Sequence, residues 1–204
     1  MTNTITAGRD LSQAEKVLIM VHGRGGDAED ILSLATNLNI ADFALMAPQA
    51  QGNSWYPFSF LSPREDNEPS LSASLKVLKS LVEVLEEKGF SKSQLYFLGF
   101  SQGACLVLDF AASDAARYGG IVAFTGGLIG EHVDHRNYKG DFDETPIFIG
   151  SSDPDAHVPV SRVKESTVLL DEMGAIVTEI IYKDRGHTIS HAEITQVNKI
   201  IFSD

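Results

Sequence analysis

Short apolar runs alternate with longer segments of mixed polarity along the whole chain. The apolar runs are strand-length and rich in Val, Ile, Leu and Phe, as expected for strands that are buried on both faces of a sheet. They predict six strands, at residues 17–21, 43–47, 94–98, 121–124, 147–149 and 175–182. Pro48 directly follows the second run and is expected to end that strand.

The segments between these runs place apolar residues three or four positions apart, which is typical of helices that bury one face. They predict helices at residues 28–37, 71–88, 104–112, 160–173 and 192–202. Asp27 is placed to cap the first helix and Gly174 to end the fourth. Strands that each lead into a helix predict an α/β fold, with a mostly parallel central sheet and helices on both faces. Ligands of such folds bind beyond the carboxyl ends of the strands.

Composition narrows the class of protein. The 204 residues, 43% hydrophobic and 22% charged, predict one globular domain over residues 1–204. The formal net charge of −12 argues against a nucleic-acid partner or an anionic membrane surface. No apolar run is long enough for membrane insertion, and the N-terminus lacks the features of a signal peptide. The single cysteine, Cys105, excludes an internal disulfide and favours a cytoplasmic location.

The pentapeptide Gly99-Phe100-Ser101-Gln102-Gly103 joins a predicted strand to a predicted helix. A Gly-x-Ser-x-Gly turn in this setting is typical of a nucleophile elbow, which exposes the serine hydroxyl above the sheet. Chance alone gives roughly 0.1 such patterns in a chain of this composition, and an idle serine in a glycine-rich turn is the competing interpretation. The strand–helix context favours Ser101 as the nucleophile of an acyl transfer reaction.

The loop after the first predicted strand, His22-Gly23-Arg24-Gly25-Gly26, is also rich in glycine. Its spacing matches neither the dinucleotide-binding pattern nor the P-loop. We expect an oxyanion loop instead, in which the backbone N–H groups of Arg24 and Gln102 stabilise a negatively charged oxygen. His22 is expected to hold this loop in place rather than to take part in catalysis.

Two further loops at the same edge of the sheet offer an acid and a base for the serine. Asp153 and Asp155 both follow the fifth strand, and either carboxylate could orient a histidine. His187 follows the sixth strand on a glycine turn and is the expected general base. Its local rival, His191, is expected inside the closing helix. Serine, aspartate and histidine stand in the chain order of an α/β-hydrolase triad.

Together these motifs resemble the phospholipase/carboxylesterase family, whose small serine hydrolases include acyl-protein thioesterases and bacterial carboxylesterases. The resemblance implies an α/β-hydrolase fold without a separate cap domain. It also implies Ser101 as nucleophile, His187 as base and Asp155 as the orienting acid. The motifs that carry it are His22-Gly23-x-Gly25, the Gly99–Gly103 elbow, Asp155-x-x-Val158-Pro159 and Gly186-His187.

Two irregular loops, residues 49–69 and 126–145, leave the same edge of the sheet and are candidates for the substrate pocket. The aromatic residues of the first loop either line an acyl pocket or cover the sheet. Trp55 is expected to contact the substrate, with Leu128 of the second loop on the opposite wall. The aromatic residues are Trp55, Tyr56, Phe58 and Phe60.

The chain is therefore expected to be a serine carboxylesterase that needs no cofactor. The acidic residues and histidines between positions 131 and 141 lack zinc-motif spacing, so a solvated loop is expected there and no metal. Cys105, within an apolar helix, is expected to be an inert buried thiol. The nearest alternative is an acyl thioesterase or lysophospholipase on the same scaffold, and the alternative of another class is a non-catalytic binding protein. The expected partner is a small ester or thioester substrate, and homodimer formation stays open.

Overall fold

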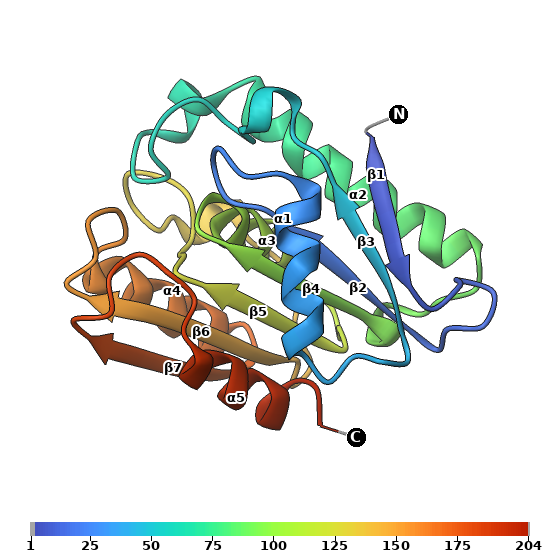
Figure 1. The fold of residues 1–204 in the computed structure, drawn as a ribbon. Coiled ribbons are helices and arrows are strands. Elements are labelled where there is room, and N and C mark those ends of the chain that lie inside the picture. Colours follow the sequence, from blue (N-terminus) through green and yellow to red (C-terminus); the bar gives the residue numbers. More distant parts are fainter. Residues whose placement is uncertain (1–2, 204) are drawn as a thin grey trace.

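The computed structural model describes residues 3–203, and in this range the chain forms one seven-stranded sheet (Figure 1). Its strands are β1 (Thr4–Gly8), β2 (Lys16–Val21), β3 (Phe43–Pro48), β4 (Leu95–Phe100), β5 (Gly120–Phe124), β6 (Pro146–Asp153) and β7 (Ile176–Lys183). They lie in the order β1-β3-β2-β4-β5-β6-β7. Every neighbouring pair is parallel except β1 with β3, which is antiparallel.

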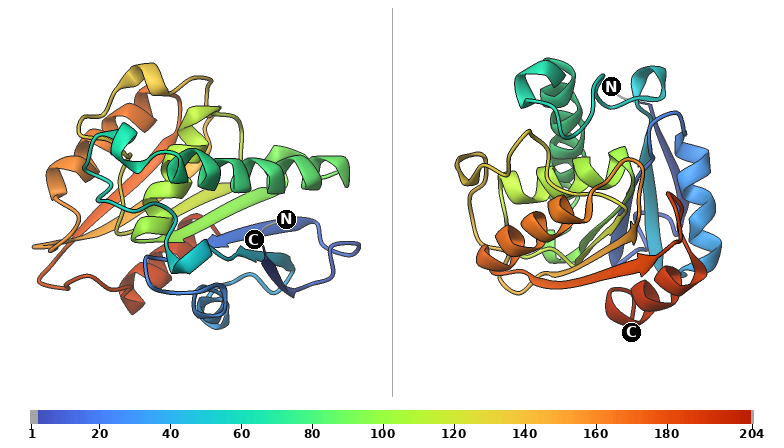
Figure 2. Two further views of the ribbon diagram at one scale, coloured as in Figure 1. Left: turned by 90° about the horizontal axis from the view of Figure 1, so that it is seen from above. Right: turned by 90° about the vertical axis from the view of Figure 1, so that its left-hand side faces the viewer.

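Helices cover both faces of the sheet. Within residues 3–203 the α-helices are α1 (Ala28–Ser33), α2 (Ser70–Glu87), α3 (Gln102–Ser113), α4 (Val160–Glu172) and α5 (His191–Ile200). Helices α1 and α5 pack on one face, and α2, α3 and α4 pack on the other (Figures 1 and 2). Single 3₁₀ turns lie at Leu34–Asn37, Gln51–Asn53, Arg64–Asn67, Lys92–Gln94 and His135–Asn137.

Alternate side chains of a central strand belong to opposite helix layers. In β2, Val17, Ile19 and Val21 pack in the core under α2, α3 and α4. Leu18 and Met20 pack in the second core, under α1 and α5. All of these side chains are fully buried. Burial on both faces is the reason that a central strand of this sheet has an unbroken apolar sequence.

The predicted α/β architecture, with its mostly parallel sheet and two helix layers, is confirmed. Helix α1 begins after Asp27, whose carboxylate accepts a hydrogen bond from the Asp30 amide in a capping box. Helix α4 ends before Gly174, which has a φ of +84°. The helix expected at residues 28–37 is shorter, because its second half tightens into a 3₁₀ turn.

The apolar pattern does not predict β1. This strand pairs antiparallel with β3 at the edge of the sheet, with Ile5 opposite Ala47. Its sequence is Thr-Ile-Thr-Ala-Gly, and its residues are half-buried or exposed. An edge strand that buries so little needs no apolar run, so the sequence carries no signal for it. None of the helices within residues 3–203 combines the length and the apolar character needed to cross a membrane.

Candidate active site

Ser101 stands at the sharp turn between β4 and α3. Its backbone has φ 53° and ψ −117°, a conformation that residues other than glycine rarely adopt. The Ser101 amide donates a hydrogen bond of 2.9 Å to the Phe124 carbonyl, and its own carbonyl accepts one of 3.0 Å from Cys105. These bonds hold the strained turn in the geometry expected of a nucleophile elbow.

The two glycines of the elbow are required by close backbone approach. A Cβ atom on Gly99 would lie 2.4 Å from the carbonyl oxygen of Gly103. A Cβ on Gly103 would lie 2.2 Å from the carbonyl oxygen of Val21, at the end of β2. Because the neighbours are backbone atoms, they cannot move aside as a flexible side chain can. The two glycines of the Gly-x-Ser-x-Gly pattern are therefore required because the start of α3 packs closely against β2 and β4.

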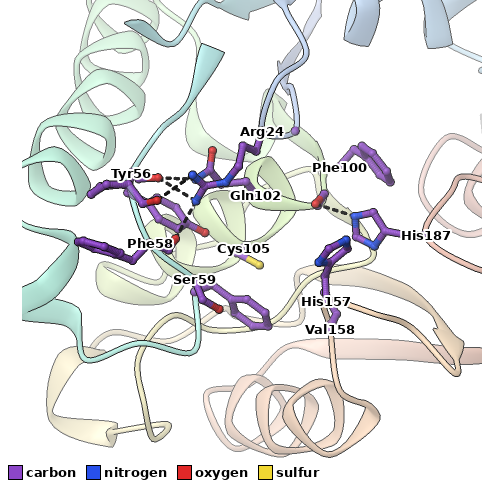
Figure 3. A pocket seen from close by; sticks show the side chains of 14 residues that line it. Arg24, Tyr56, Phe58, Ser59, Phe100, Gln102, Cys105, His157, Val158 and His187 are labelled. Atoms are coloured by element: carbon purple, nitrogen blue, oxygen red, sulfur yellow. Dashed lines mark hydrogen bonds between the residues drawn. The ribbon is translucent and has the colours of Figure 1, made fainter. Parts of the chain in front are cut away.

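The three residues predicted as a triad lie in hydrogen-bond contact. Nε2 of His187 lies 2.8 Å from Oγ of Ser101, although 86 positions separate the two residues (dashed line to His187 in Figure 3). Nδ1 of His187 lies 3.0 and 3.2 Å from the two carboxylate oxygens of Asp155. The Asp155 side chain is fully buried, and that of His187 is 22% exposed. The loops that follow β6 and β7 therefore bring an acid and a base to the serine at the end of β4.

Asp155 is held in its charged form by its own loop. Burial raises the pKa of this carboxyl, but hydrogen bonds from the amides of His157 and Val158, and from His187, outweigh burial and lower the pKa below its ordinary value. Asp153 lies at the exposed end of β6 instead. His191 is the first residue of α5 and is exposed. The geometry thus favours Asp155 and His187 over their local rivals.

A buried polar network supports the loop that carries His187. Oγ of Ser152 accepts hydrogen bonds from the amides of Arg185 and Gly186, at 3.1 and 3.0 Å. The Arg185 guanidinium forms an ion pair with Glu193 in α5, which is fully buried. Burial raises the pKa of Glu193 above its ordinary value, and the hydrogen bonds from Ser190 and Arg185 offset only part of that effect. The sequence pattern does not predict these contacts.

The two residues predicted for the oxyanion hole lie at the ends of adjacent strands. Gln102 opens α3 directly after the nucleophile, and Arg24 lies in the loop that follows β2. Within the described part of the chain, neither backbone N–H has a protein acceptor. Both residues line the same pocket as Ser101. Two free amides beside the nucleophile, one of them at the start of α3, suit an oxyanion.

The side chains of Arg24 and Gln102 both hold residues 54–60, which we call the aromatic loop. The Arg24 guanidinium donates hydrogen bonds of 2.7–3.0 Å to the carbonyls of Tyr56, Pro57 and Phe58 (Figure 3). The Gln102 amide group donates to the Tyr56 carbonyl at 2.7 Å and accepts from the amide of Trp55 at 2.9 Å. Each residue of the oxyanion pair is thereby tied to one wall of the pocket.

His22 has the structural role that was expected for it. Its Nε2 accepts a hydrogen bond of 3.1 Å from the Ala50 amide, so its Nδ1 carries the proton and donates to the Gly23 carbonyl at 2.7 Å. The ring is buried and stacks 5.0 Å from that of Trp55. His22 thus joins the glycine loop to the start of the next irregular segment, which confirms the prediction.

Residues 3–203 match the model of a known family, Phospholipase/Carboxylesterase. The chain belongs to this family. A phospholipase/carboxylesterase of Dyadobacter fermentans shares 48% sequence identity and a TM-score of 0.98, over 100% of this chain and 97% of that one. Acyl-protein thioesterase 1 of Saccharomyces cerevisiae is 29% identical over 184 residues, 78% of each chain. The Bacillus cereus carboxylesterase shares the fold, with a TM-score of 0.79 at 21% identity over 98% and 92% of the two chains.

The family match supports an ester-hydrolysing enzyme. The chain has a pocket of about 410 Å³ beside Ser101. Tyr56, Phe58 and Phe60 form one wall, so these aromatic residues of the loop line the pocket. Cys105, one helical turn after the nucleophile, also lines it. Burial raises the pKa of the Cys105 thiol to about 12, which leaves it protonated and unreactive at neutral pH.

The structure corrects two expectations about the pocket of this family member. Trp55 does not line it: the side chain is 2% exposed, and its indole N–H donates to the His22 carbonyl behind the wall. Leu128 is fully buried and is also absent from the lining, because Ser166 and Arg162 bind its backbone and draw it toward α4. Both side chains are buried in the packing of the loops, outside the lining of this pocket.

One residue of the pocket has no counterpart in the sequence predictions. His157 lines it from the loop after β6, with its ring beside that of His187 (Figure 3). His157 occupies an unspecified position of the Asp155-x-x-Val158-Pro159 motif, so no sequence signal marks its side chain as functional. The histidines and acids at positions 131–141 form no group that could hold a metal ion within residues 3–203.

Proposed function

We propose that this protein is a serine carboxylesterase, with Ser101, His187 and Asp155 as its catalytic triad. The observation that carries the proposal is the continuous hydrogen-bond path from the Ser101 hydroxyl through the imidazole of His187 to Asp155, with steps of 2.8 and 3.0 Å. A serine bonded to a histidine that a carboxylate orients is an activated nucleophile. The matched family and the names of its relatives agree with this chemistry.

Ester hydrolysis on these residues proceeds in two stages. His187 removes the proton of Ser101 through Nε2 while Oγ attacks the ester carbonyl carbon. The backbone N–H groups of Arg24 and Gln102 stabilise the oxyanion of the tetrahedral intermediate. His187 then returns the proton to the departing alcohol, which leaves an acyl group on Ser101. A water molecule activated by the same imidazole releases the carboxylic acid.

The pocket favours small acyl groups. Its volume of about 410 Å³ must hold both the acyl group and part of the alcohol. Cys105, Tyr56 and Phe60 line it and are themselves buried, so they cannot easily be displaced by a longer acyl chain. We expect kcat/KM to rise from acetate to butyrate esters and to fall for long-chain esters.

The test is the turnover of p-nitrophenyl acetate by the Ser101→Ala variant. We expect kcat to fall by at least about 10³-fold, because the nucleophile is lost while the fold remains. The matched control is Ser72→Ala, an exposed serine on α2, which should keep full activity. A fluorophosphonate probe should label the wild-type protein and not the Ser101 variant. Undiminished turnover by Ser101→Ala would overturn the proposal, and an unlabelled wild type would favour a binding protein.

The nearest alternative is an acyl thioesterase, the activity named for relatives in two yeasts. The triad chemistry is the same, so the pocket must distinguish the two functions. Oxygen esters and thioesters with the same acyl group distinguish the two functions when they are compared at equal concentration. The series runs from about two to about sixteen acyl carbons. A higher kcat/KM for long-chain thioesters would favour the alternative.

A further inference from the structure

His157 places a second imidazole directly beside the proposed general base. The rings of His157 and His187 lie 4.8 Å apart at an angle of 77°, an edge-to-face contact. Both rings line the pocket that contains Ser101 (Figure 3). Unlike the buried His22, His157 is exposed to solvent at the mouth of this pocket.

The backbone of His157 is fixed although its ring is exposed. Its amide donates a 2.8 Å hydrogen bond to Oδ1 of Asp155, and the next residue, Val158, donates to the same oxygen and is buried. The backbone from which the ring projects is therefore fixed relative to the carboxylate that contacts His187. A residue held this way can present its side chain to a substrate with little loss of conformational freedom.

The ring nitrogens of His157 are available to a ligand. Within residues 3–203 neither nitrogen has a hydrogen-bond or ion-pair partner. The other large polar group at the pocket, the guanidinium of Arg24, is occupied by three backbone carbonyls. A neutral imidazole offers one donor and one acceptor, which suits a hydroxyl group.

The step in which His187 donates its proton to the leaving alcohol indicates which part of the substrate lies near His157. As general acid, Nε2 of His187 must come within about 3 Å of the oxygen of the leaving alcohol. With the two ring centres 4.8 Å apart, the first atoms of that alcohol lie within reach of the His157 ring. Cys105 and Phe60 line the same pocket and are buried, so they offer the acyl group an apolar surface.

We propose that His157 is a specificity-determining residue that binds a hydroxyl group on the leaving alcohol. The preferred substrates are then monoesters of a diol or polyol, with the second hydroxyl two or three carbons from the ester oxygen. This inference rests on the proposed esterase function and adds the substrate class on the alcohol side. His157 takes no proton in the reaction, and its contribution is confined to recognition.

Two esters of equal size test the proposal. Propyl acetate and 2-hydroxyethyl acetate have the same acyl group and differ only by a terminal methyl or hydroxyl. Their kcat/KM values are measured at constant pH by acid release, and the ratio of hydroxyethyl to propyl ester is compared among variants. His157→Phe keeps a ring against His187 and removes both nitrogens. His157→Gln keeps a donor and an acceptor without the ring.

We expect His157→Phe to lower this ratio about three- to tenfold, the range of one hydrogen bond. His157→Gln should recover part of the ratio. The control is His132→Phe: His132 is exposed and does not line this pocket, so its substitution should leave the ratio at the wild-type value. An equal loss for both esters in His157→Phe, or a ratio that rises, would overturn the proposal. Absence of Ser101-dependent turnover of either ester would instead overturn the esterase function itself.

Discussion

At the scale of single residues, the backbone conformation of Ser101 determines where its hydroxyl group lies. Its positive φ places the hydroxyl toward His187 and away from the sheet, and backbone hydrogen bonds to Phe124 and Cys105 hold that conformation. The strain of such a residue is tolerated only where the surrounding structure fixes it. The flanking glycines are part of this support, since they allow the elbow to press against the end of β2.

A methyl group at Gly103 should damage the elbow. In Gly103→Ala the new Cβ would lie 2.2 Å from the Val21 carbonyl oxygen and 2.5 Å from that of His22. We expect the free energy of unfolding in urea to fall by about 2 kcal/mol or more, with a parallel loss of kcat. The control is Gly26→Ala, whose Cβ would meet its nearest atom at 3.5 Å. Equal stability of the two variants would contradict this steric account.

Substitution of the two competing aspartates should separate their roles. Asp155→Asn removes the charge that orients His187, and we expect kcat to fall by about 10³- to 10⁴-fold. Asp153→Asn changes an exposed residue at the end of β6 and should keep kcat within about twofold of the wild type. Steady-state kinetics on one ester decides the matter. A larger loss in Asp153→Asn would reverse the assignment of the acid.

The lowered pKa of Asp155 also predicts a dependence of stability on pH. Because the folded-state pKa lies below the unfolded value, the folded protein binds fewer protons at this site. The charged carboxylate therefore stabilises the fold above the unfolded pKa, and this contribution is lost as pH falls through the folded pKa. The difference in urea midpoint between wild type and Asp155→Asn should narrow from about pH 6 to about pH 3. A difference that widens would be inconsistent with the lowered pKa.

At the scale of elements, hydrogen bonds join the aromatic loop to the loop after β2, which is the proposed oxyanion loop. The Arg24 side chain donates hydrogen bonds to three successive carbonyls of the aromatic loop, while its backbone N–H has no acceptor among residues 3–203. On the other side, the side chain of Gln102 bonds the same loop. A change in the aromatic loop should therefore reach the oxyanion hole through ordinary hydrogen bonds.

Arg24→Lys tests this coupling. A single ammonium group cannot reproduce the contacts of a planar guanidinium with three carbonyls. We expect kcat/KM to fall about tenfold, and amide hydrogen exchange in residues 54–60 to become faster. Arg136→Lys is the control, since Arg136 is exposed and pairs with the nearby Asp134. Unchanged exchange in the aromatic loop together with unchanged kinetics would show that the two loops are independent.

The elements that the sequence predicts are those with a strong local cause. Central strands such as β2 are buried on both faces and must be apolar throughout, whereas β1 lies at the edge and leaves no such pattern. Loop side chains are harder to predict, because the sequence does not say which way a loop turns. The sequence therefore predicts Trp55 in the pocket, whereas the structure has this side chain buried behind the pocket wall. His157 lines the pocket, and no sequence pattern predicts this.

At the scale of the whole molecule, the sheet explains why the candidate triad could be predicted at all. Its three members each follow a parallel strand, and such strands share one carboxyl edge. No comparable rule predicts which charged residues stabilise the loops around the site. Arg64 on the first irregular loop forms two hydrogen bonds with the fully buried Asp109 of α3, and Tyr138 of the second loop bonds the same carboxylate. These partners are far apart in sequence, so only the folded chain shows that Asp109 joins the two loops.

The net charge gives the molecule a field that should act on substrates. The chain carries 28 acidic and 16 basic residues. Two of its arginines are paired inside the fold, since Arg64 and Arg185 form ion pairs with the buried carboxylates Asp109 and Glu193. An anionic ester therefore approaches a molecule of strongly negative net charge, and this long-range repulsion is weakened by salt.

Two substrates isolate the effect of net charge. They are p-nitrophenyl succinate, which carries one negative charge, and the neutral p-nitrophenyl butyrate, whose acyl group has the same number of carbons. Between about 10 mM and about 300 mM NaCl the screening length shortens from about 30 Å to well under 10 Å. We expect kcat/KM for the succinate ester to rise severalfold over this range, while that for the butyrate ester stays nearly constant. A fall in kcat/KM for the succinate ester would mean that a local positive charge at the pocket mouth outweighs the net charge. The sign of the salt effect thus decides whether the whole molecule or the residues at the pocket mouth govern the encounter with charged substrates.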